Sequence, residues 1–165
     1  MVKNRTIVFL ASFFLLFFVI GCSGSAAQEG ASGKAPEFTL KDIDGNSVQL
    51  SDFSGNVVIL DFFASWCPPC KQEIPDFIEL SRAYGPRGFT MLGISLEAAG
   101  PTKRFADKMG INYPVLLDDG KVSGAYGPIR AIPTTFVIDR NGNFARHYIG
   151  YRPKNVFEKD LEELL

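Results

Sequence analysis

The stretch that most limits what this chain can fold into is Trp-Cys-Pro-Pro-Cys at residues 66–70. Cys67 and Cys70 follow an apolar run at residues 57–63 and precede a segment with helical spacing. A strand that delivers Cys67 to a helix N-terminus gives its sulfur backbone N–H groups and the positive end of the helix dipole. Both favour the thiolate. Cys70, one turn further along, could attack a mixed disulfide formed by Cys67. The motif therefore predicts a dithiol–disulfide exchange site.

The composition limits the class of protein. A chain of 165 residues suits one domain, and a hydrophobic fraction of 46% is enough for a sizeable core. The formal net charge is −1, so no excess of basic side chains indicates a nucleic-acid partner. Three cysteines is an odd number, so Cys22, outside the CxxC pair, needs an explanation of its own.

The N-terminus has the pattern of a secretory signal. Lys3 and Arg5 precede an uncharged, almost wholly apolar run at residues 7–20. This run is shorter than the roughly 20 residues that a membrane-spanning helix needs, and it has the length of the apolar part of a signal peptide. It leads into Val-Ile-Gly-Cys at residues 19–22, which resembles the bacterial lipobox, where the cysteine is acylated and begins the mature protein. An uncleaved signal anchor with an idle Cys22 is the alternative.

These features divide the chain into three predicted parts. Residues 1–21 are predicted to be a lipoprotein signal peptide, and residues 22–35 a flexible tether that carries the lipid on Cys22. The tether is rich in Ser, Gly and Ala, so it buries too little apolar surface to order itself. Residues 36–165 are predicted to fold. We therefore expect a domain anchored by lipid to a bacterial membrane, outside the cytoplasm.

The folded part has the pattern of an α/β domain. Strands are predicted at residues 36–40, 47–50, 57–63, 89–96, 114–117, 134–139 and 144–149. Helices are predicted from residue 68 to about residue 85, and at residues 101–109, 121–126 and 153–165. The apolar run at 57–63, broken only by Asp61, predicts a strand covered on both faces. Pro75 lies inside the first helix and is predicted to kink it. Alternating strands and helices, followed by an antiparallel pair, predict helices packed on a sheet.

Five landmarks together resemble a known family. They are the strand and motif at residues 58–70, Pro75 in the following helix, the Ala-Ile-Pro-Thr-Thr run within residues 131–139, the hairpin that begins at residues 36–40, and Ile-Ser-Leu-Glu at residues 94–97. The chain resembles thioredoxin-fold proteins of the ResA/TlpA type, which are membrane-anchored, extracytoplasmic thiol–disulfide oxidoreductases. The resemblance spans about residues 35–165. It implies a thioredoxin fold, a central mixed sheet flanked by helices, with an added N-terminal β-hairpin and a β-α insertion.

The two cysteines of the motif are the predicted catalytic residues. Cys67 is expected to attack a substrate disulfide, and Cys70 to resolve the mixed disulfide, so the pair alternates between dithiol and disulfide. The alternative is half of a zinc site. Zinc takes four protein ligands in such sites, and only His147 could join the pair. We therefore expect neither a metal nor another cofactor.

Two acidic residues are candidate proton carriers. Asp61 interrupts an apolar strand, so burial is predicted to raise its pKa. In thioredoxins the matching aspartate lies behind the second cysteine, so the resemblance implies a base for Cys70. The alternative is a carboxylate with water access and no role. The resemblance also implies that Glu97 approaches the CxxC pair as a second acid or base, against the alternative of a surface carboxylate.

Five residues are predicted to bind substrate around the sulfurs. The resemblance implies a cis Ile132–Pro133 peptide, which would present the backbone of Ile132 to an extended substrate. Trp66 is predicted to be a partly exposed platform, with a core tryptophan as the alternative. Pro68 and Pro69 constrain the loop and remove amide donors near sulfur, with opposing effects on the pKa of Cys67 whose net sign stays open.

The leading functional hypothesis is a monomeric reductase of protein disulfides. The resemblance implies a membrane thiol transporter as electron donor and apocytochrome c cysteines as targets. A disulfide oxidase or isomerase on the same scaffold is the alternative, because direction depends on reduction potential. A peroxiredoxin is less favoured, since Ala64 stands where those enzymes have Thr or Ser. A binding module with a structural disulfide is the alternative that involves no catalysis.

Overall fold

The computed structural model of this chain describes residues 33–165. The predicted signal peptide, Cys22 and most of the predicted tether lie outside the described residues. Within residues 33–165, no helix has the length and apolar character that crossing a membrane requires.

A seven-stranded mixed sheet forms the centre of the domain, in the order β2-β1-β5-β4-β3-β6-β7. The strands are β1 (Thr39–Asp42), β2 (Ser47–Gln49), β3 (Val57–Phe63), β4 (Phe89–Ser95), β5 (Val115–Leu117), β6 (Thr134–Ile138) and β7 (Phe144–Ile149). Every residue of β3 is buried, between parallel β4 and antiparallel β6. This confirms the prediction of a strand covered on both faces. The predicted thioredoxin-type mixed sheet with an added N-terminal hairpin is also confirmed.

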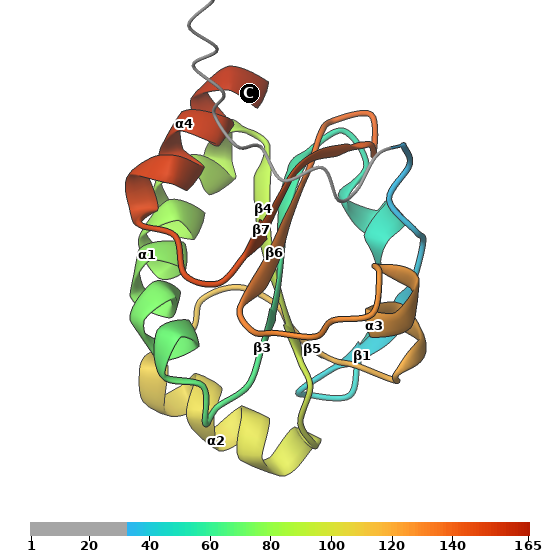
Figure 1. Cartoon of the computed structure of the whole chain (residues 1–165), viewed down its shortest axis with the longest axis vertical. Coiled ribbons are helices and arrows are strands. Elements are labelled where there is room, and N and C mark those ends of the chain that lie inside the picture. The colour runs from blue at the N-terminus through green and yellow to red at the C-terminus, as the bar shows by residue number, and fades with distance from the viewer. Residues whose placement is uncertain (1–32) are drawn as a thin grey trace, which may run out of the picture.

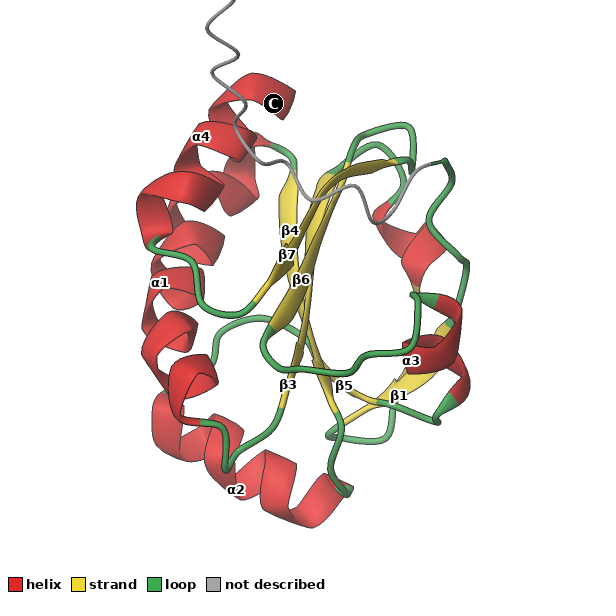
Figure 2. Ribbon diagram, in the orientation of Figure 1, coloured by secondary structure: helices red, strands yellow, loops and turns green. Residues whose placement is uncertain are grey.

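Helices cover both faces of this sheet (Figures 1 and 2). They are α1 (Pro68–Tyr84), α2 (Ala99–Met109), α3 (Lys121–Ala125) and α4 (Lys154–Leu164), with short 3₁₀ helices at Leu50–Phe53 and Gly85–Arg87. Helices α1, α2 and α4 lie on one face, where Ile59 of β3 packs with Phe77 of α1 and Phe157 of α4. On the other face, Leu60 packs with Val122 of α3. Successive side chains of β3 therefore point alternately into the hydrophobic cores on the two faces of the sheet.

The first strand differs from its prediction. It begins at Thr39 and not at residue 36, because the residues before it bond to the β6–β7 turn. Ala35 donates its N–H to Gly142 O at 2.9 Å, and Pro36 has no N–H to give to a sheet. The strand extends instead to Asp42, which pairs with Leu116 of β5. The other predicted strands and helices are present, with ends shifted by one or two residues.

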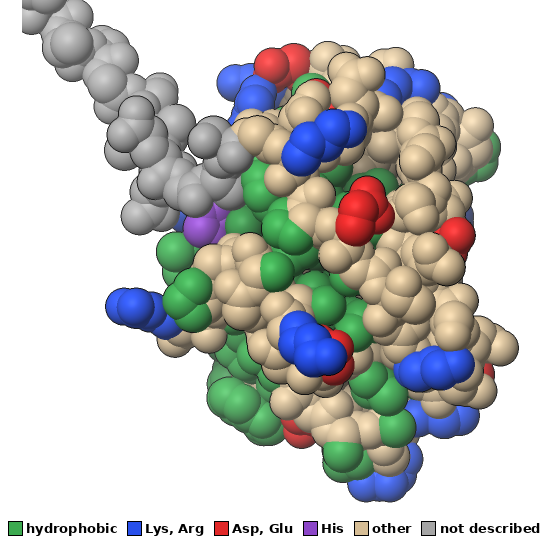
Figure 3. All heavy atoms as spheres, turned by 90° about the vertical axis from the view of Figure 1, so that its right-hand side faces the viewer, with side chains coloured by type: hydrophobic (Ala, Val, Ile, Leu, Met, Phe, Trp, Pro, Cys, Tyr) green, Lys and Arg blue, Asp and Glu red, His purple; other side chains and the backbone are tan. Residues whose placement is uncertain are grey.

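The face that carries α3 and the N-terminal hairpin is mixed in character. Lys and Arg side chains are scattered over it among acidic and apolar ones (Figure 3). No continuous basic stripe of the kind that follows a nucleic-acid backbone is visible on this face.

Candidate active site

The C-terminal end of β3 delivers the two cysteines to the start of α1. Cys67 is the N-cap of α1, with Pro68 and Pro69 in the first turn, where a missing N–H costs little. Cys67 and Cys70 form a disulfide, with their Cα atoms 5.3 Å apart. The N–H of Cys70 donates to Cys67 Sγ at 3.2 Å. The predicted placement of Cys67 at a helix N-terminus is thus confirmed.

The surroundings of the disulfide are unevenly exposed. Cys67 and Cys70 are 2% and 0% exposed, whereas the neighbouring Trp66 is 66% exposed. Pro68 is also exposed, and Pro69 is half-buried. The alternative of a core tryptophan is wrong, since most of the Trp66 side chain lies in solvent. The sulfurs therefore lie just below a surface on which Trp66 is the largest exposed apolar group next to them.

The peptide between Ile132 and Pro133 is cis, as the resemblance implied. It stands immediately before β6, whose first residue, Thr134, pairs with Phe62 of β3. This register brings the peptide to the end of the sheet that carries the disulfide. Ile132 O lies 3.7 Å from Cys67 Sγ, so the backbone of Ile132 faces the reactive sulfur.

Asp61 lies on the face of β3 that α1 covers. It is 2% exposed, which rules out a water-exposed carboxylate. The Thr135 hydroxyl donates to Asp61 Oδ1 at 3.1 Å. Burial raises the pKa of Asp61 well above its ordinary value, and the nearby Glu73 carboxyl adds to the rise, while the Thr135 hydrogen bond opposes it. Asp61 is therefore a buried carboxyl with a raised pKa in the layer between α1 and the sheet.

Glu73 is a second buried carboxyl that the sequence analysis missed. It lies one turn after Cys70 in α1 and is 0% exposed. Its Oε1 accepts the backbone N–H of Arg152 at 2.9 Å, while its Oε2 has no hydrogen-bond partner among residues 33–165. Burial raises the pKa of Glu73 to about 7. The helical spacing of the sequence could have predicted this burial, because Glu73 shares the inward face of α1 with Cys70 and Phe77.

Glu97 contacts the turn before the cysteines. Its Oε2 accepts the backbone N–H of Ser65, and its Oε1 accepts the Ser65 hydroxyl at 3.1 Å. The N–H of Glu97 donates to Ser95 Oγ at 3.2 Å, and that hydroxyl lies 2.7 Å from Thr102 Oγ1. Both carboxylate oxygens are thus committed to Ser65, two residues before Cys67. The structure brings Glu97 to the active-site turn as the resemblance implied, but through Ser65.

The order of strands and helices, the disulfide at the start of α1 and the cis peptide beside it can now be compared with known proteins. Residues 31–147 match the AhpC/TSA family. The chain belongs to this family of thioredoxin-fold proteins. It is 34% identical over 132 residues to the thiol–disulfide oxidoreductase ResA of Geobacillus thermodenitrificans, covering 79% of this chain and 75% of that protein. It is 32% identical over 133 residues to the ResA protein of Bacillus anthracis, covering 79% and 76%.

Solved structures of thioredoxin-family proteins agree with this assignment. A thiol:disulfide interchange protein of the thioredoxin family from Chlorobium tepidum superimposes with a TM-score of 0.76 at 34% identity, covering 81% of this chain and 96% of that one. The thioredoxin domain of a thiol–disulfide oxidoreductase from Bacteroides vulgatus gives 0.73 at 25% identity, covering 82% and 98%. This protein is a thiol–disulfide oxidoreductase, and Cys67–Cys70 is its bonded cysteine pair.

Proposed function

We propose that this protein reduces protein disulfides outside the cytoplasm, tethered to a bacterial membrane by lipid on Cys22. The observation that carries the direction is the charge around the sulfurs. A strongly oxidising dithiol protein has a stabilised reduced form, which requires groups that favour a thiolate. Here the two prolines have opposing effects, but the buried carboxyls of Asp61 and Glu73, when ionised, disfavour a second negative charge on a nearby sulfur. This environment favours a low potential.

In the proposed reaction the Cys67 thiolate attacks a sulfur of the substrate disulfide. The substrate S–S bond breaks, its other sulfur leaves and takes up a proton, and a mixed disulfide with Cys67 remains. Cys70 then transfers its thiol proton to ionised Asp61, and the Cys70 thiolate attacks Cys67 Sγ. The bond to the substrate breaks, and the departing substrate thiolate takes up the proton held by Asp61. The reduced substrate leaves, and the protein holds the Cys67–Cys70 disulfide. A dithiol on a membrane thiol transporter returns two electrons and two protons.

Substrate binding is assigned to the surface around Cys67. The backbone of Ile132 faces the sulfur, and cis Pro133 fixes its direction, so an extended peptide can pair with it as an added strand. Exposed Trp66 provides an apolar platform beside the same sulfur. Pro68 and Pro69, in the first turn of α1 directly after Cys67, are assigned to the same surface. Unfolded segments around a disulfide, such as the cysteine pair of an apocytochrome c, have the extended form that this surface requires.

Glu97 is proposed as a positioning residue. Its two bonds to Ser65 hold the turn that carries Trp66 and Cys67. A loose turn would let Cys67 leave the helix N-terminus, where its thiolate is stabilised. Glu97 would thus act through the Ser65 backbone and hydroxyl on the reactivity of Cys67.

The reduction potential of the Cys67–Cys70 pair tests the direction. The full-length chain is equilibrated with dithiothreitol or glutathione redox buffers, and the oxidised fraction is measured. We expect a value close to the thioredoxin end of the scale, about −270 mV. A value close to about −120 mV would reject the reductase and support the disulfide oxidase.

A further inference from the structure

Tyr113 packs over β4, the strand that pairs with β3 beside Asp61. Gly93 of β4 pairs in register with Asp61 of β3, so their side-chain positions are on the same face of the sheet. A Cβ on Gly93 would lie 3.0 Å from Phe63 Cε1 and 3.4 Å from Tyr113 Cε2. The two rings therefore occupy the space that a side chain at position 93 would fill. Tyr113 packs against the cores around α1 and α2, and its hydroxyl is close enough to Asp61 and Glu73 for their charges to raise its pKa.

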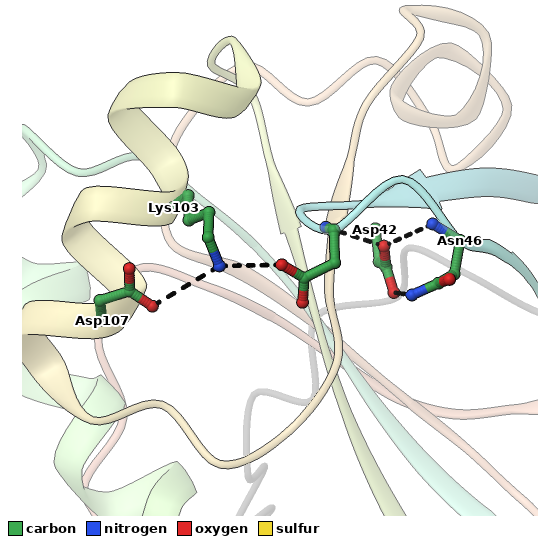
Figure 4. A network of polar contacts seen from close by, with 5 residues as sticks. Asp42, Asn46, Lys103 and Asp107 are labelled. Carbon is green, nitrogen blue, oxygen red and sulfur yellow. Dashed lines mark hydrogen bonds and ion pairs between the residues drawn. The ribbon is translucent and has the colours of Figure 1, made fainter.

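Tyr113 also lines a pocket between α2 and the N-terminal hairpin. The pocket has a volume of about 420 Å³, enough for several water molecules. Its rim is charged but internally paired: Lys103 Nζ binds Asp44 at 2.8 Å and lies 3.8 Å from Asp107 (Figure 4). Asp42 accepts hydrogen bonds from Asn46 in the same network. Tyr113 thus borders both a pocket large enough for water and the layer that holds the two buried carboxyls.

The groups that face this carboxyl pair come from several elements. From α1, Asp76 raises the pKa of Glu73, and from the β7–α4 connection Arg152 lowers it through its charge and its N–H bond. From β6, Thr135 binds Asp61. The residues of α2 that pack here, Phe105, Ala106 and Met109, are apolar. Burial raises the pKa of Tyr113 well above its ordinary value, so its hydroxyl stays neutral.

We propose that the Tyr113 ring is a plug that keeps water in this pocket away from Asp61 and Glu73, and so sets the pH at which the pair gives up its proton. A carboxyl deprived of water holds its proton more tightly, because its anion is poorly solvated. Removing the Tyr113 ring would let water from the pocket reach Asp61 and Glu73, and this water would stabilise their carboxylate anions. Tyr113 therefore acts through the two carboxyls as a positioning residue.

This proposal rests on the proposed proton-holding role of the pair in the exchange reaction. With a pKa of about 7, Glu73 is about one-tenth ionised at pH 6. With water access and a pKa of about 5, it would be about nine-tenths ionised at that pH. An opened plug would therefore leave the carboxyls charged through the mildly acidic range. They could then not return a proton to Cys70 when the disulfide is reduced, which is the reverse of the transfer from Cys70 to Asp61 in the forward reaction.

The test is a carboxyl titration of the oxidised full-length protein, followed by ¹³C NMR with labelled Asp and Glu. In Tyr113→Ala we expect the midpoint of Glu73 to fall by one pH unit or more, and that of Asp61 to fall with it. Tyr113→Phe keeps the ring and is expected to titrate like the wild type. Unchanged midpoints in Tyr113→Ala, or equal shifts in Tyr113→Phe, overturn the plug.

A second variant guards against a Tyr113→Ala protein that does not fold. Tyr113→Leu removes the aromatic ring but keeps an apolar side chain in the layer, so its midpoints are expected to fall in the same direction. Tyr84→Ala is the matched control, because it truncates a tyrosine packed in the same core but not beside Gly93. An unshifted Tyr113→Leu titration counts against the plug.

The rate of reduction by dithiothreitol across pH 5–9 separates the two proposals. If the midpoints fall and the rate profile moves with them, both the plug and the role of the pair are supported. If the midpoints fall and the profile does not move, the plug is supported and the proton role of Asp61 and Glu73 is rejected.

Discussion

A carboxyl group in an apolar layer resists ionisation, and Glu73 lies in such a layer one turn below Cys70. Asp61 reaches the same layer from β3, so two acids share one low-dielectric space. Their proximity makes it hard for both to be charged at once. At the residue scale, the proposed proton transfer therefore depends on these two carboxyls.

The buried Glu73 carboxyl predicts a specific dependence of stability on pH. Because its pKa is raised in the folded state from 4.5 to about 7, its contribution to stability is fully present below about pH 4.5 and is lost as the pH rises through 7. Glu73→Gln removes this loss. We expect the oxidised variant to be more stable than the wild type at pH 8, by on the order of 1–3 kcal/mol. Urea denaturation at pH 5 and pH 8 measures the difference.

The control for this experiment is an exposed glutamate. Glu162 lies on the solvent side of α4, so Glu162→Gln changes the net charge equally and is expected to leave the pH dependence as in the wild type. Equal behaviour of the two variants would show that Glu73 ionises in the folded protein as easily as a solvated carboxyl.

At the scale of elements, the β4–α2 connection holds the turn between β3 and α1. Glu97 spans the two connections through Ser65, and Leu96 N–H donates to Phe63 O at 3.0 Å just beside it. The sequence predicted both strands and both helices, because their apolar periodicity is local. It did not predict which backbone group Glu97 would bind, because Ser65 is 32 residues away and only the parallel pairing of β3 with β4 brings them together.

Removing the hydrogen bonds between Glu97 and Ser65 is expected to lower the reactivity of Cys67. In Glu97→Ala the turn loses two hydrogen bonds, so the Cys67 thiolate should be less well stabilised and its alkylation by iodoacetamide at pH 7 should slow severalfold. Ser65→Ala keeps the backbone N–H bond and should give an intermediate rate. The reduced full-length proteins are compared from pH 5 to pH 9. If the pH profile of the Glu97→Ala alkylation rate instead lost an inflection at acidic pH and kept the wild-type rate above pH 7, Glu97 would be assigned to proton transfer.

At the scale of the whole molecule, the described chain begins far from the disulfide. Gly33 O accepts the N–H of Phe144, and Lys34 bridges to Asn143, so these residues lie at the β6–β7 turn. That turn is at the end of the sheet where Val58 pairs with Ile138, opposite the end that carries Cys67 (Figure 1). A tether that enters here would leave the disulfide facing away from its anchor and open to substrates.

The anchor itself is tested by Cys22→Ser. We expect the wild-type protein to sediment with membranes and to carry an acyl mass on Cys22, and the variant to lose the acyl mass and the processing that depends on it. Cys70→Ser is the control, because it also removes one thiol and should remain lipidated. A Cys22→Ser protein with unchanged processing and membrane association would support the uncleaved signal anchor.

The class of the fold, the Cys67–Cys70 pair and the helix that carries it could be predicted from the sequence alone. These depend on local spacing, on proline and glycine positions, and on the resemblance that the full set of landmarks supports. Three arrangements depend on the packing of distant segments: Glu73 lies near Asp61, Glu97 binds Ser65, and Tyr113 covers Gly93. The reason is physical: whether a carboxyl or a ring is solvated depends on which distant strands and helices close over it. Periodicity along one segment does not contain that information.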